Sequence, residues 1–343
     1  MPEVDGAGIA LIAGVIVLAA AALCAALILL LRPLFLRYAL ARPNARSLHS
    51  TPTPQGGGVA VVTATFAVGL AAILLSSAAA GTGLPPVLLL LAAAVLLAVI
   101  GAIDDIRPLA AGPRLLLQLG AVALVVTALP HDLRVVEALP LWLERGLVVI
   151  AGLWFVNLVN FMDGMDWMTV AEAVPVTAGL IVLGALGALP PAAVLLALAL
   201  LGALLGFAPF NKPVARLFLG DAGSLPLGLM LGWLLLILAA NGQLAAALIL
   251  PLYYLADATI TLFRRLFAGE RIWQAHRTHY YQRATQHGLT VPAIIGRVFA
   301  LNCALVAMAA VTVLSDSLAI DLAMLALAGA LVAWLLIGFA RGS

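Results

Sequence analysis

The chain has 343 residues, of which 65% are hydrophobic and 9% are charged, and its mean hydropathy is +1.19. These values exclude a soluble globular protein and predict an all-α polytopic membrane protein, with one domain over residues 1–343. The net charge of +2 says little about partners, because in a membrane protein the distribution of arginine carries the information. Cys24 and Cys303 lie inside apolar segments, so neither a disulfide framework nor a thiolate metal site is expected.

Apolar segments of about 20 residues are long enough to cross a bilayer as helices. The first covers residues 9–31, where acidic Glu3 and Asp5 precede it and arginines follow it. A signal peptide has the reverse charge order, so this segment should remain as a helix with its N-terminus outside and residues 32–57 in the cytoplasm. Ten further spans are predicted at residues 58–78, 87–103, 113–129, 146–159, 171–189, 192–207, 222–240, 244–262, 292–314 and 319–340.

With the N-terminus outside and about eleven transmembrane helices, an odd number, the C-terminus is expected in the cytoplasm. The cytoplasmic loops after residue 57 are then 104–112, 160–170, 208–221 and 263–291. Of the 17 basic residues only Arg134 and Arg145 fall outside, in agreement with the positive-inside rule. The longer outer segment, 130–145, is expected to lie as a short interfacial helix.

Every cluster of polar residues falls in a cytoplasmic loop. The first cluster runs from Arg46 through His49 to Gly58 and places two prolines and three glycines just before a helix. Glycine N–H groups at such a position can bind phosphate, and glycines also let two helices pack closely. Both interpretations stay open for this loop.

Asp104 and Asp105 end an apolar helix. Adjacent carboxylates on a helix point about 100° apart, so one should face a site while the other holds its geometry. Such a pair suits Mg²⁺, which proteins commonly bind with one or two carboxylates plus substrate phosphate. The alternative is a solvated helix terminus balanced by Arg107.

Residues 157–167 hold the densest group of polar side chains. If the segment is helical, Asn157, Asn160 and Asp163 fall within an arc of about 120°, with Asp166 close beside Asp163. Polar groups at the end of an apolar helix are costly in lipid and usually functional. The pattern predicts an acceptor-rich patch at the membrane surface.

Two further clusters are basic. In one, Asn211, Lys212 and Arg216 precede Asp221, which lies between glycines where a metal or phosphate can approach the next helix. An ordinary N-cap is the alternative for that aspartate. The other contains His276, Arg277, His279 and Arg283. Positive charge disfavours zinc there and suits a diphosphate, although lipid headgroups could also attract these arginines.

In this order the segments resemble the polyprenyl-phosphate N-acetylhexosamine-1-phosphate transferases, the glycosyltransferase family 4 group that includes phospho-N-acetylmuramoyl-pentapeptide transferase. The resemblance covers about Arg46 to Arg283. The Pro-Thr-Pro-x-Gly-Gly-Gly loop and the His-Arg-x-His segment are similar to the bacterial branch that initiates O-antigen and related surface glycans. The resemblance implies transfer of a sugar 1-phosphate from a UDP-sugar to undecaprenyl phosphate, with release of UMP, at the cytoplasmic face of the bacterial inner membrane.

The resemblance also implies roles for individual residues. It implies Mg²⁺, or Mn²⁺ in its place, bound by Asp221, Asn160 and Asp163. The residues implied as catalytic are Asp104, Asp105, Asp221 and His279. Those implied in substrate binding are Asn157, Asn160, Asp163, Asp166, Asn211, Arg216, His276, Arg277, Arg283, Arg46 and His49. The expected partners are the UDP-sugar, undecaprenyl phosphate and the bilayer, without nucleic acid; a homodimer is one option that these residues do not decide.

Four positions depart from the family or stay open. Trp167 stands where the family usually has glycine, and Gln55 where this branch often has arginine. The lysine that often follows the aspartate pair is represented by Arg107 or Arg114. Asp257 is expected either to pair with Arg264 or Arg265 or to face the groove of the lipid phosphate.

Three alternatives were weighed. A peptidoglycan lipid I-type transferase belongs to the same family. A membrane transporter of a phosphorylated substrate would place charges near helix midpoints, whereas apart from Asp257 the acids cluster at inner helix ends. A CDP-alcohol phosphotransferase needs Asp-Gly-x-x-Ala-Arg, but Asp163 and Gly164 are followed by Met-Asp-Trp-Met.

Overall fold

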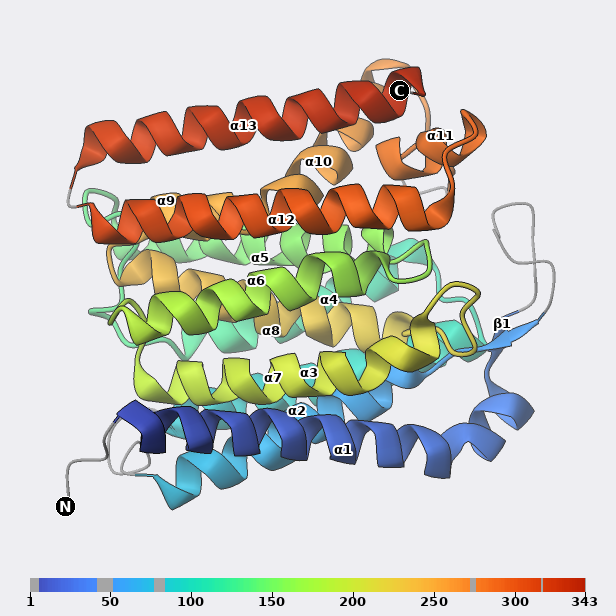
Figure 1. The fold of residues 1–343 in the computed structure, drawn as a ribbon, viewed down its shortest axis with the longest axis horizontal. Coiled ribbons are helices and arrows are strands. Elements are labelled where there is room, and N and C mark those ends of the chain that lie inside the picture. Colours follow the sequence, from blue (N-terminus) through green and yellow to red (C-terminus); the bar gives the residue numbers. More distant parts are fainter. Residues whose placement is uncertain (1–5, 42–51, 77–83, 272–275, 316, 343) are drawn as a thin grey trace.

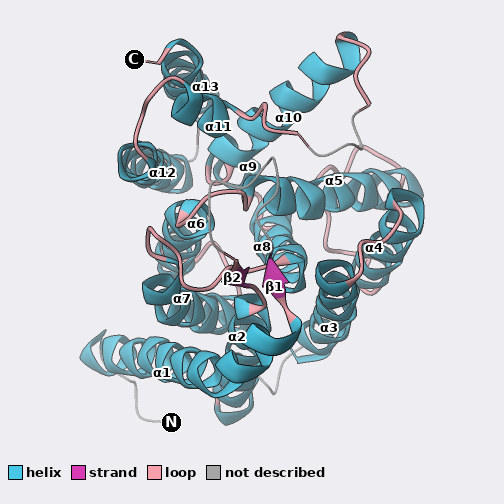
Figure 2. Cartoon of the chain, turned by 90° about the vertical axis from the view of Figure 1, so that its right-hand side faces the viewer, coloured by secondary structure: helices cyan, strands magenta, loops and turns pink. Residues whose placement is uncertain are grey.

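The computed structural model describes residues 6–41, 52–76, 84–271, 276–315 and 317–342. Long helices lie side by side along the longest axis (Figure 1), and Figure 2 shows many of them nearly end on. The helices are α1 Gly6–Tyr38, α2 Gly57–Leu75, α3 Leu84–Ile106, α4 Ala111–Thr127, α5 Leu141–Met162, α6 Met168–Ala185, α7 Pro191–Asn211, α8 Asp221–Ala240, α9 Leu244–Ile249, α10 Leu252–Phe267, α11 Tyr280–Gln286, α12 Val291–Leu314 and α13 Leu318–Arg341.

Nine of the described helices are long and apolar enough to cross a membrane. The prediction of an all-α polytopic membrane protein is therefore confirmed. The 17-residue α4 and the consecutive helices α9 and α10 coincide with the two other predicted spans. Helix α1 begins and α13 ends at opposite ends of the bundle (Figure 1). The count of eleven spans and their orientation stay predictions.

Two predicted segments differ from the structure. The span expected at 244–262 is divided into α9 and α10, because Pro251 lacks the N–H that a continuous helix would need. The interfacial helix expected at 130–145 is wrong: residues 130–140 form turns, and α5 begins at Leu141. Glu144 holds these turns by accepting hydrogen bonds from the N–H groups of Val135 and Val136, at 2.6 and 3.1 Å.

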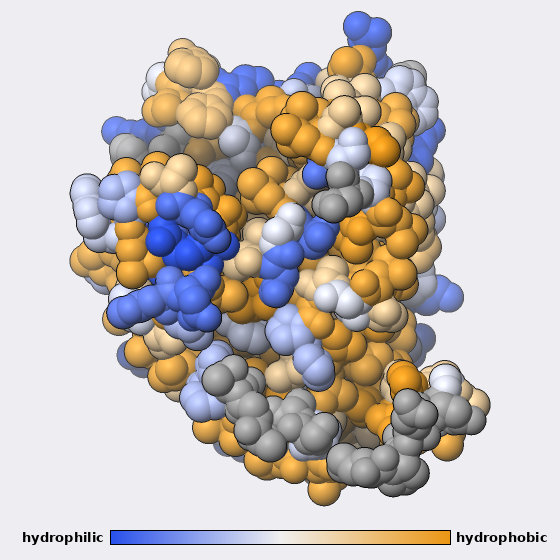
Figure 3. Space-filling model, turned by 90° about the vertical axis from the view of Figure 1, so that its left-hand side faces the viewer, coloured by the Kyte–Doolittle hydropathy of each residue, from blue (hydrophilic) through white to orange (hydrophobic). Residues whose placement is uncertain are grey.

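Figure 3 looks at the end of the bundle opposite to β1 and α11, where hydrophilic residues gather among apolar ones. Arg134 also pairs there with Glu144. The Arg145 side chain donates to the carbonyl oxygens of Pro130 and Leu133, at 2.6 and 2.8 Å. Both of the basic residues predicted outside are thus engaged in closing this turn region.

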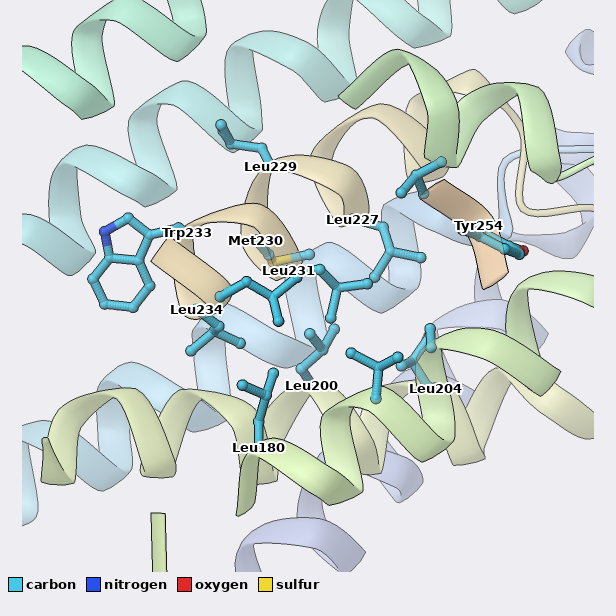
Figure 4. Close-up of a cluster of buried hydrophobic side chains, with 14 of the residues drawn as sticks. Leu180, Leu200, Leu204, Leu227, Leu229, Met230, Leu231, Trp233, Leu234 and Tyr254 are labelled. Atoms are coloured by element: carbon cyan, nitrogen blue, oxygen red, sulfur yellow. The ribbon is translucent and has the colours of Figure 1, made fainter. Parts of the chain in front are cut away.

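Helix α8 occupies the centre of the bundle. Sixteen of its 20 residues are buried, as expected for a helix that is apolar on every side. It packs against α2, α3 and α5. Figure 4 shows leucines of α8 gathered with Leu200, Leu204 and Leu180 of the neighbouring helices. Asp221 begins this central helix, so the surrounding helices fix the position of its carboxylate.

Glycines allow two helices to approach the start of α8 closely. A Cβ on Gly58 of α2 would lie 1.9 Å from the Cα of Gly223, and a Cβ on Gly101 of α3 would lie 2.3 Å from the carbonyl oxygen of Asp221. The N–H groups of Gly57 and Gly58 donate to the carbonyls of Phe218 and Leu219, at 3.0 and 2.9 Å. These two N–H groups are thus used within the protein, which confirms the packing interpretation of the triple glycine.

The loop before α2 adds a small sheet that the sequence did not predict. Strand β1, Leu40–Ala41, pairs antiparallel with β2, Thr53–Pro54. Phe218 continues the hydrogen bonding by donating its N–H to the carbonyl of Pro54 at 2.9 Å. The β strands lie at the same end of the bundle as α11 (Figures 1 and 2). This is the end where α3 stops and α8 begins.

A buried polar pair joins α6 to α12. The Nδ2 group of Asn302 donates to Glu172 Oε2 at 2.7 Å and to the carbonyl of Ala171 at 3.0 Å. The other oxygens, Glu172 Oε1 and Asn302 Oδ1, are buried without a hydrogen-bond partner among the described residues. Neither residue belongs to the polar clusters identified in the sequence.

Asn302→Leu should lower the free energy of unfolding by about 1–3 kcal/mol, because Glu172 loses its amide donor while remaining buried. We expect Glu172→Met combined with Asn302→Leu to be more stable than the single variant, since two apolar side chains replace both partners. Thermal unfolding in detergent would measure both, with Cys303→Ala, an exposed neighbour on α12, as the control. An unchanged unfolding temperature for Asn302→Leu would contradict the importance of this pair.

Candidate active site

The aspartate pair of α3 meets the first turn of α8. Asp105 accepts hydrogen bonds from the N–H groups of Asp221 and Ala222, at 3.1 and 3.2 Å. The first N–H groups of a helix have no partner within it, so the Asp105 carboxylate caps α8 from outside. Its negative charge also interacts favourably with the positive N-terminal end of the helix dipole. Gln55, at the position where arginine was expected, donates to the carbonyl of Asp105 at 3.1 Å. Asp105 therefore holds the geometry of Asp221.

Asp104 turns to a basic residue instead. It accepts hydrogen bonds from the N–H of Leu109 and from Nη1 of Arg114, both at 2.6 Å. The same Arg114 nitrogen lies 3.6 Å from Asp221 Oδ2. Of the two arginines that the sequence left open, Arg114 is the one that joins the aspartates.

The end of α5 supplies two more polar groups. Asn160 Nδ2 donates to Asp221 Oδ1 at 2.7 Å and to Ser224 Oγ at 2.8 Å. Asp163 follows the last residue of α5 and accepts a hydrogen bond from Thr169 Oγ1 at 2.5 Å. Burial raises the pKa of the Asp163 carboxyl to about 8; the Thr169 hydrogen bond opposes this shift and nearby carboxylates, including Asp221, add to it.

We call Asp104, Asp105, Asp163 and Asp221 the acid cluster. Among the described residues, no three His, Cys, Asp or Glu side chains converge closely enough to form a metal site by themselves. Mg²⁺ in phosphoryl transfer needs only one or two carboxylates when substrate phosphate supplies other oxygens. Burial is the main cause of the raised pKa of Asp163, and the repulsion from neighbouring carboxylates that adds to it would be relieved by such a cation. Asp221 and Asp163 are therefore suitable ligands, and Asn160 orients Asp221.

Asp166 and Asn211, which were predicted to bind substrate, instead connect two loops of the protein. Asp166 Oδ2 accepts the N–H of Ala215 at 2.9 Å. Asn211 accepts the N–H of Trp167 at 2.8 Å and donates to the carbonyl of Leu217 at 3.0 Å. Both side chains are buried, so these contacts join residues 163–167 to residues 211–217. Arg216 in the same loop is exposed.

Trp167 has φ of 59°, the one positive φ of a non-glycine residue in the described part of the chain. Glycine adopts this left-handed conformation freely, whereas a side chain is strained in it, so the conformation fits the glycine that the family resemblance implies at this position. The indole Nε1 donates to the carbonyl of Ala208 at 2.6 Å. The ring is thus tied to the end of α7, which positions it beside the joined loops.

Asn157 differs most from its predicted place. It was expected to share a patch with Asn160, but its amide is buried and donates to Gln118 Oε1 and to the carbonyl of Leu153, both at 2.8 Å. Asn157 and Asn160 lie on the same helix, three residues apart, but the Asn157 side chain points toward α4. The hydrogen bond from Asn157 to Gln118 therefore holds α4 against α5. Its predicted contact with substrate finds no support in these partners.

The basic loop, residues 276–283, lies over the end of α5. Tyr281 Oη donates to the carbonyl of Phe161 at 3.4 Å, and a Cβ on Gly164 would lie 2.2 Å from that hydroxyl. Arg264 donates to the carbonyl of Thr278 at 2.6 Å, and the Arg283 guanidinium lies 5.8 Å from the centre of the Tyr280 ring. These contacts bring the basic loop beside Asp163.

The two histidines of this loop differ in environment. His276 and Arg277 are partly exposed, whereas His279 is buried and does not present its ring to solvent as a catalytic group would. His279 Nδ1 lies 3.1 Å from Asp257 Oδ1. Asp257 was expected to pair with Arg264 or Arg265 or to face the groove of the lipid phosphate, but its buried carboxylate contacts His279. Arg46 and His49 lie outside the described residues.

Several site residues escaped the sequence analysis. Ser224 and Thr169 hydrogen-bond Asn160 and Asp163, and Tyr281 anchors the basic loop. Ser224 lies in the quoted motif, Gly-Asp-Ala-Gly-Ser, but small hydroxyl residues are common in membrane helices. Tyr281 comes shortly after the two histidines in the sequence, and this position could have marked it as part of the site. Thr169 carried no signal of its own.

Comparison with known proteins agrees with this arrangement. A sequence profile of glycosyl transferase family 4 matches residues 87–239. A probable undecaprenyl-phosphate N-acetylglucosaminyl 1-phosphate transferase of Bacillus subtilis is 27% identical over 303 residues, which cover 80% of each chain. A decaprenyl-phosphate N-acetylglucosaminephosphotransferase of Mycolicibacterium smegmatis is 31% identical, covering 59% of this chain and 54% of the relative.

A phospho-N-acetylmuramoyl-pentapeptide-transferase of Synechococcus sp. is 40% identical over 147 residues, which cover 38% of this chain and 42% of the relative. The profile match spans Asp104, Asp163 and Asp221, so it includes the three segments that form the acid cluster. Together with the multi-pass helical bundle, these similarities support a relationship between the chain and glycosyl transferase family 4.

Proposed function

We propose that the protein is a polyprenyl-phosphate N-acetylhexosamine-1-phosphate transferase that takes its donor from a UDP-sugar. The observation that carries this proposal is the meeting of the acid cluster with the basic loop at one end of a membrane bundle. Carboxylates suit a phosphate-bound divalent cation, and arginines suit the phosphates themselves. The names of the relatives from Bacillus subtilis and Mycolicibacterium smegmatis point to the same reaction.

The reaction joins two anions. A phosphate oxygen of the lipid attacks the β-phosphorus of the UDP-sugar, a new P–O–P bond forms, and the bond between the two donor phosphates breaks to release UMP. The second pKa of a phosphomonoester is about 6, so the nucleophile is already ionised at neutral pH. The protein has to hold the two phosphates in line and stabilise the charge on UMP.

The residues of the site divide this work. Asp221 and Asp163 would hold Mg²⁺, with Asn160 and Asp105 fixing the position of Asp221. When bound, the cation supplies positive charge at the diphosphate. Arg114 lies between Asp104 and Asp221 and adds a fixed positive charge at the same place. Arg277 and Arg283 of the basic loop would contact the outer phosphate oxygens.

An apolar cavity suits the lipid acceptor. A cavity of about 290 Å³ lies among α4, α5, α8, α9 and α10, and aromatic Trp154, Phe155 and Trp233 belong to its lining. Its lining includes Val156 of α5, the helix that ends directly before Asp163. The broken span at Pro251 also borders the cavity. Apolar walls of this kind favour a hydrocarbon tail.

We also propose a place for this reaction in the cell. A lipid diphosphate-linked sugar is the starting point for a surface glycan, and we assign the protein to the first membrane step of O-antigen or related glycan synthesis in the bacterial inner membrane. The relative from Synechococcus sp. is a phospho-N-acetylmuramoyl-pentapeptide-transferase, so the donor of a peptidoglycan lipid I-type reaction is the second candidate. We propose that the Trp167 ring, tied to the end of α7, influences which donor the protein accepts.

The test uses the full chain purified in detergent, with undecaprenyl phosphate, Mg²⁺ and one donor at a time. We expect UMP release from UDP-N-acetylglucosamine or another UDP-N-acetylhexosamine, and none after addition of EDTA. Release only from UDP-N-acetylmuramoyl-pentapeptide would replace the proposed donor by the peptidoglycan one. No UMP from any of these donors would overturn the proposed reaction.

A further inference from the structure

The carboxylate of Asp257 is fully buried in α10 and faces four donors. Its Oδ1 accepts the N–H of Tyr280 at 3.0 Å and the hydroxyl of Thr261 at 3.3 Å. Its Oδ2 accepts the N–H of Tyr281 at 3.3 Å. Tyr280 and Tyr281 begin α11, where N–H groups have no partner within the helix. Asp257 therefore fixes the start of α11 on α10.

The fourth donor is the ring of His279. Its Nδ1 lies 3.1 Å from Asp257 Oδ1, so this nitrogen carries the proton. The ring is 4% exposed and is stacked between two others. The centre of the His276 ring lies 4.9 Å away and that of the Tyr281 ring 5.8 Å away. A buried ring held in this way is suited to support its neighbours.

The outer ring of the stack belongs to His276. Its Nδ1 lies 2.9 Å from the hydroxyl of Thr278 and 3.4 Å from the N–H of the same residue, which donates to it. Nδ1 is therefore the acceptor, and the proton of the neutral ring is on Nε2. Burial lowers the pKa of His276 to about 4, with the charge of His279 and of arginines adding to the shift. His276 is a neutral hydrogen-bond donor at neutral pH.

We infer that Asp257 is a positioning residue, which acts through His279 to hold His276 where it donates a hydrogen bond to the diphosphate of the UDP-sugar. This inference rests on the proposed function. Tyr281 connects the inner face of the stack to the end of α5 through the carbonyl of Phe161. The stack is thereby fixed with respect to Asp163, which lies two residues further along the chain. Neither Asp257 nor His279 touches the substrate.

The first test is Asp257→Asn. If the amide oxygen replaces Oδ1, the N–H₂ group faces the N–H of Tyr281; if the N–H₂ group replaces Oδ1, it faces the donors of both Tyr280 and His279. Either orientation sets an N–H₂ group against a donor and removes the charge that holds the ring of His279. We expect the KM for the UDP-sugar to rise about tenfold, because a small misplacement of a binding group is costly, while the KM for undecaprenyl phosphate changes less than about twofold. A variant that merely folds less well would lower the apparent kcat and leave both KM values unchanged.

Two further variants test whether Asp257 acts through His279. Thr261→Val removes the other side-chain hydrogen bond to Asp257 and leaves the contact with His279, so the KM for the donor should stay at the wild-type value. His279→Ala should raise the donor KM as Asp257→Asn does. If Asp257 acts through His279, adding Asp257→Asn to His279→Ala should change the donor KM by less than about twofold.

An unchanged donor KM in Asp257→Asn, measured against an active wild-type protein, would overturn the inference and leave the proposed function intact. Multiplicative effects of Asp257→Asn and His279→Ala would overturn it as well, since they would mean that the two residues act independently. A wild-type protein that releases no UMP from any donor would overturn the proposed function and the inference together.

Discussion

Asp221→Asn should lower kcat by about 100-fold or more, because the substitution removes the negative charge at the centre of the acid cluster and preserves the shape of the side chain. Asn160 can still donate to the amide oxygen at the same position, so the first turn of α8 should keep its conformation. Initial rates of UMP release at saturating donor and acceptor would measure the effect.

The matched control for this variant is Asp132→Asn, which changes an exposed aspartate in the turn region at the opposite end of the bundle. It should have the kcat of the wild-type protein. Thermal unfolding of both variants should occur at temperatures near the wild-type value. An Asp221→Asn protein with more than about one tenth of the wild-type kcat would remove Asp221 from the metal site.

Gly101→Ala should damage both the fold and the site. A Cβ at this position would lie 2.3 Å from the carbonyl carbon and the carbonyl oxygen of Asp221 and 2.5 Å from the nitrogen of Ala222. Those atoms are backbone and cannot turn away, so α3 and α8 must separate. We expect a loss of about 1–3 kcal/mol in unfolding free energy and, since Asp105 then loses its hold on α8, a fall in kcat of about tenfold or more.

Gly120→Ala provides the control, because the corresponding Cβ on α4 meets no atom within 4 Å. Unfolding temperature and UMP release should both stay at wild-type values in that variant. A Gly101→Ala protein as stable and as active as Gly120→Ala would show that the contact between α3 and α8 does not fix the acid cluster.

The helices were predictable because their signal is local. A run of apolar residues long enough to span a bilayer identifies a helix without knowledge of its neighbours, and each of the eleven predicted ranges overlaps a described helix. The break at Pro251 was not predicted, although the proline that causes it is present in the sequence. The turns at 130–140 were not predicted either, because Glu144 accepts from backbone N–H groups several residues away, and no local pattern encodes such partners.

The polar residues of the site were identified by their unusual place in an apolar chain, but their partners were not. Asp105 binds the start of α8 across 116 residues of sequence, and Asn160 binds Asp221 across 61. Such pairings depend on how the helices pack. The choice of Arg114 over Arg107, the inward turn of Asn157 and the contact of Asp257 with His279 all depend on that packing, so the sequence alone left them open or misplaced them.

The order of the motifs along the chain indicated the family, which no single motif could do. An Asp-Asp pair or a glycine-rich loop has an ordinary structural explanation when taken alone, and the structure gives that explanation for Gly57 and Gly58. The family resemblance pointed instead to segments that the fold brings to one end of the bundle. It also drew attention to Trp167, which has the positive φ that glycine adopts without strain.

The most direct test of sugar 1-phosphate transfer follows the phosphorus atom. A UDP-N-acetylglucosamine, or whichever donor releases UMP, is labelled with ³²P at the β-phosphorus and incubated with the purified protein, Mg²⁺ and undecaprenyl phosphate. If the lipid phosphate attacks that phosphorus, the label moves into the organic phase with the lipid while unlabelled UMP stays in water. Label that remains in water as UDP, while the sugar moves to the lipid, would contradict the proposed reaction.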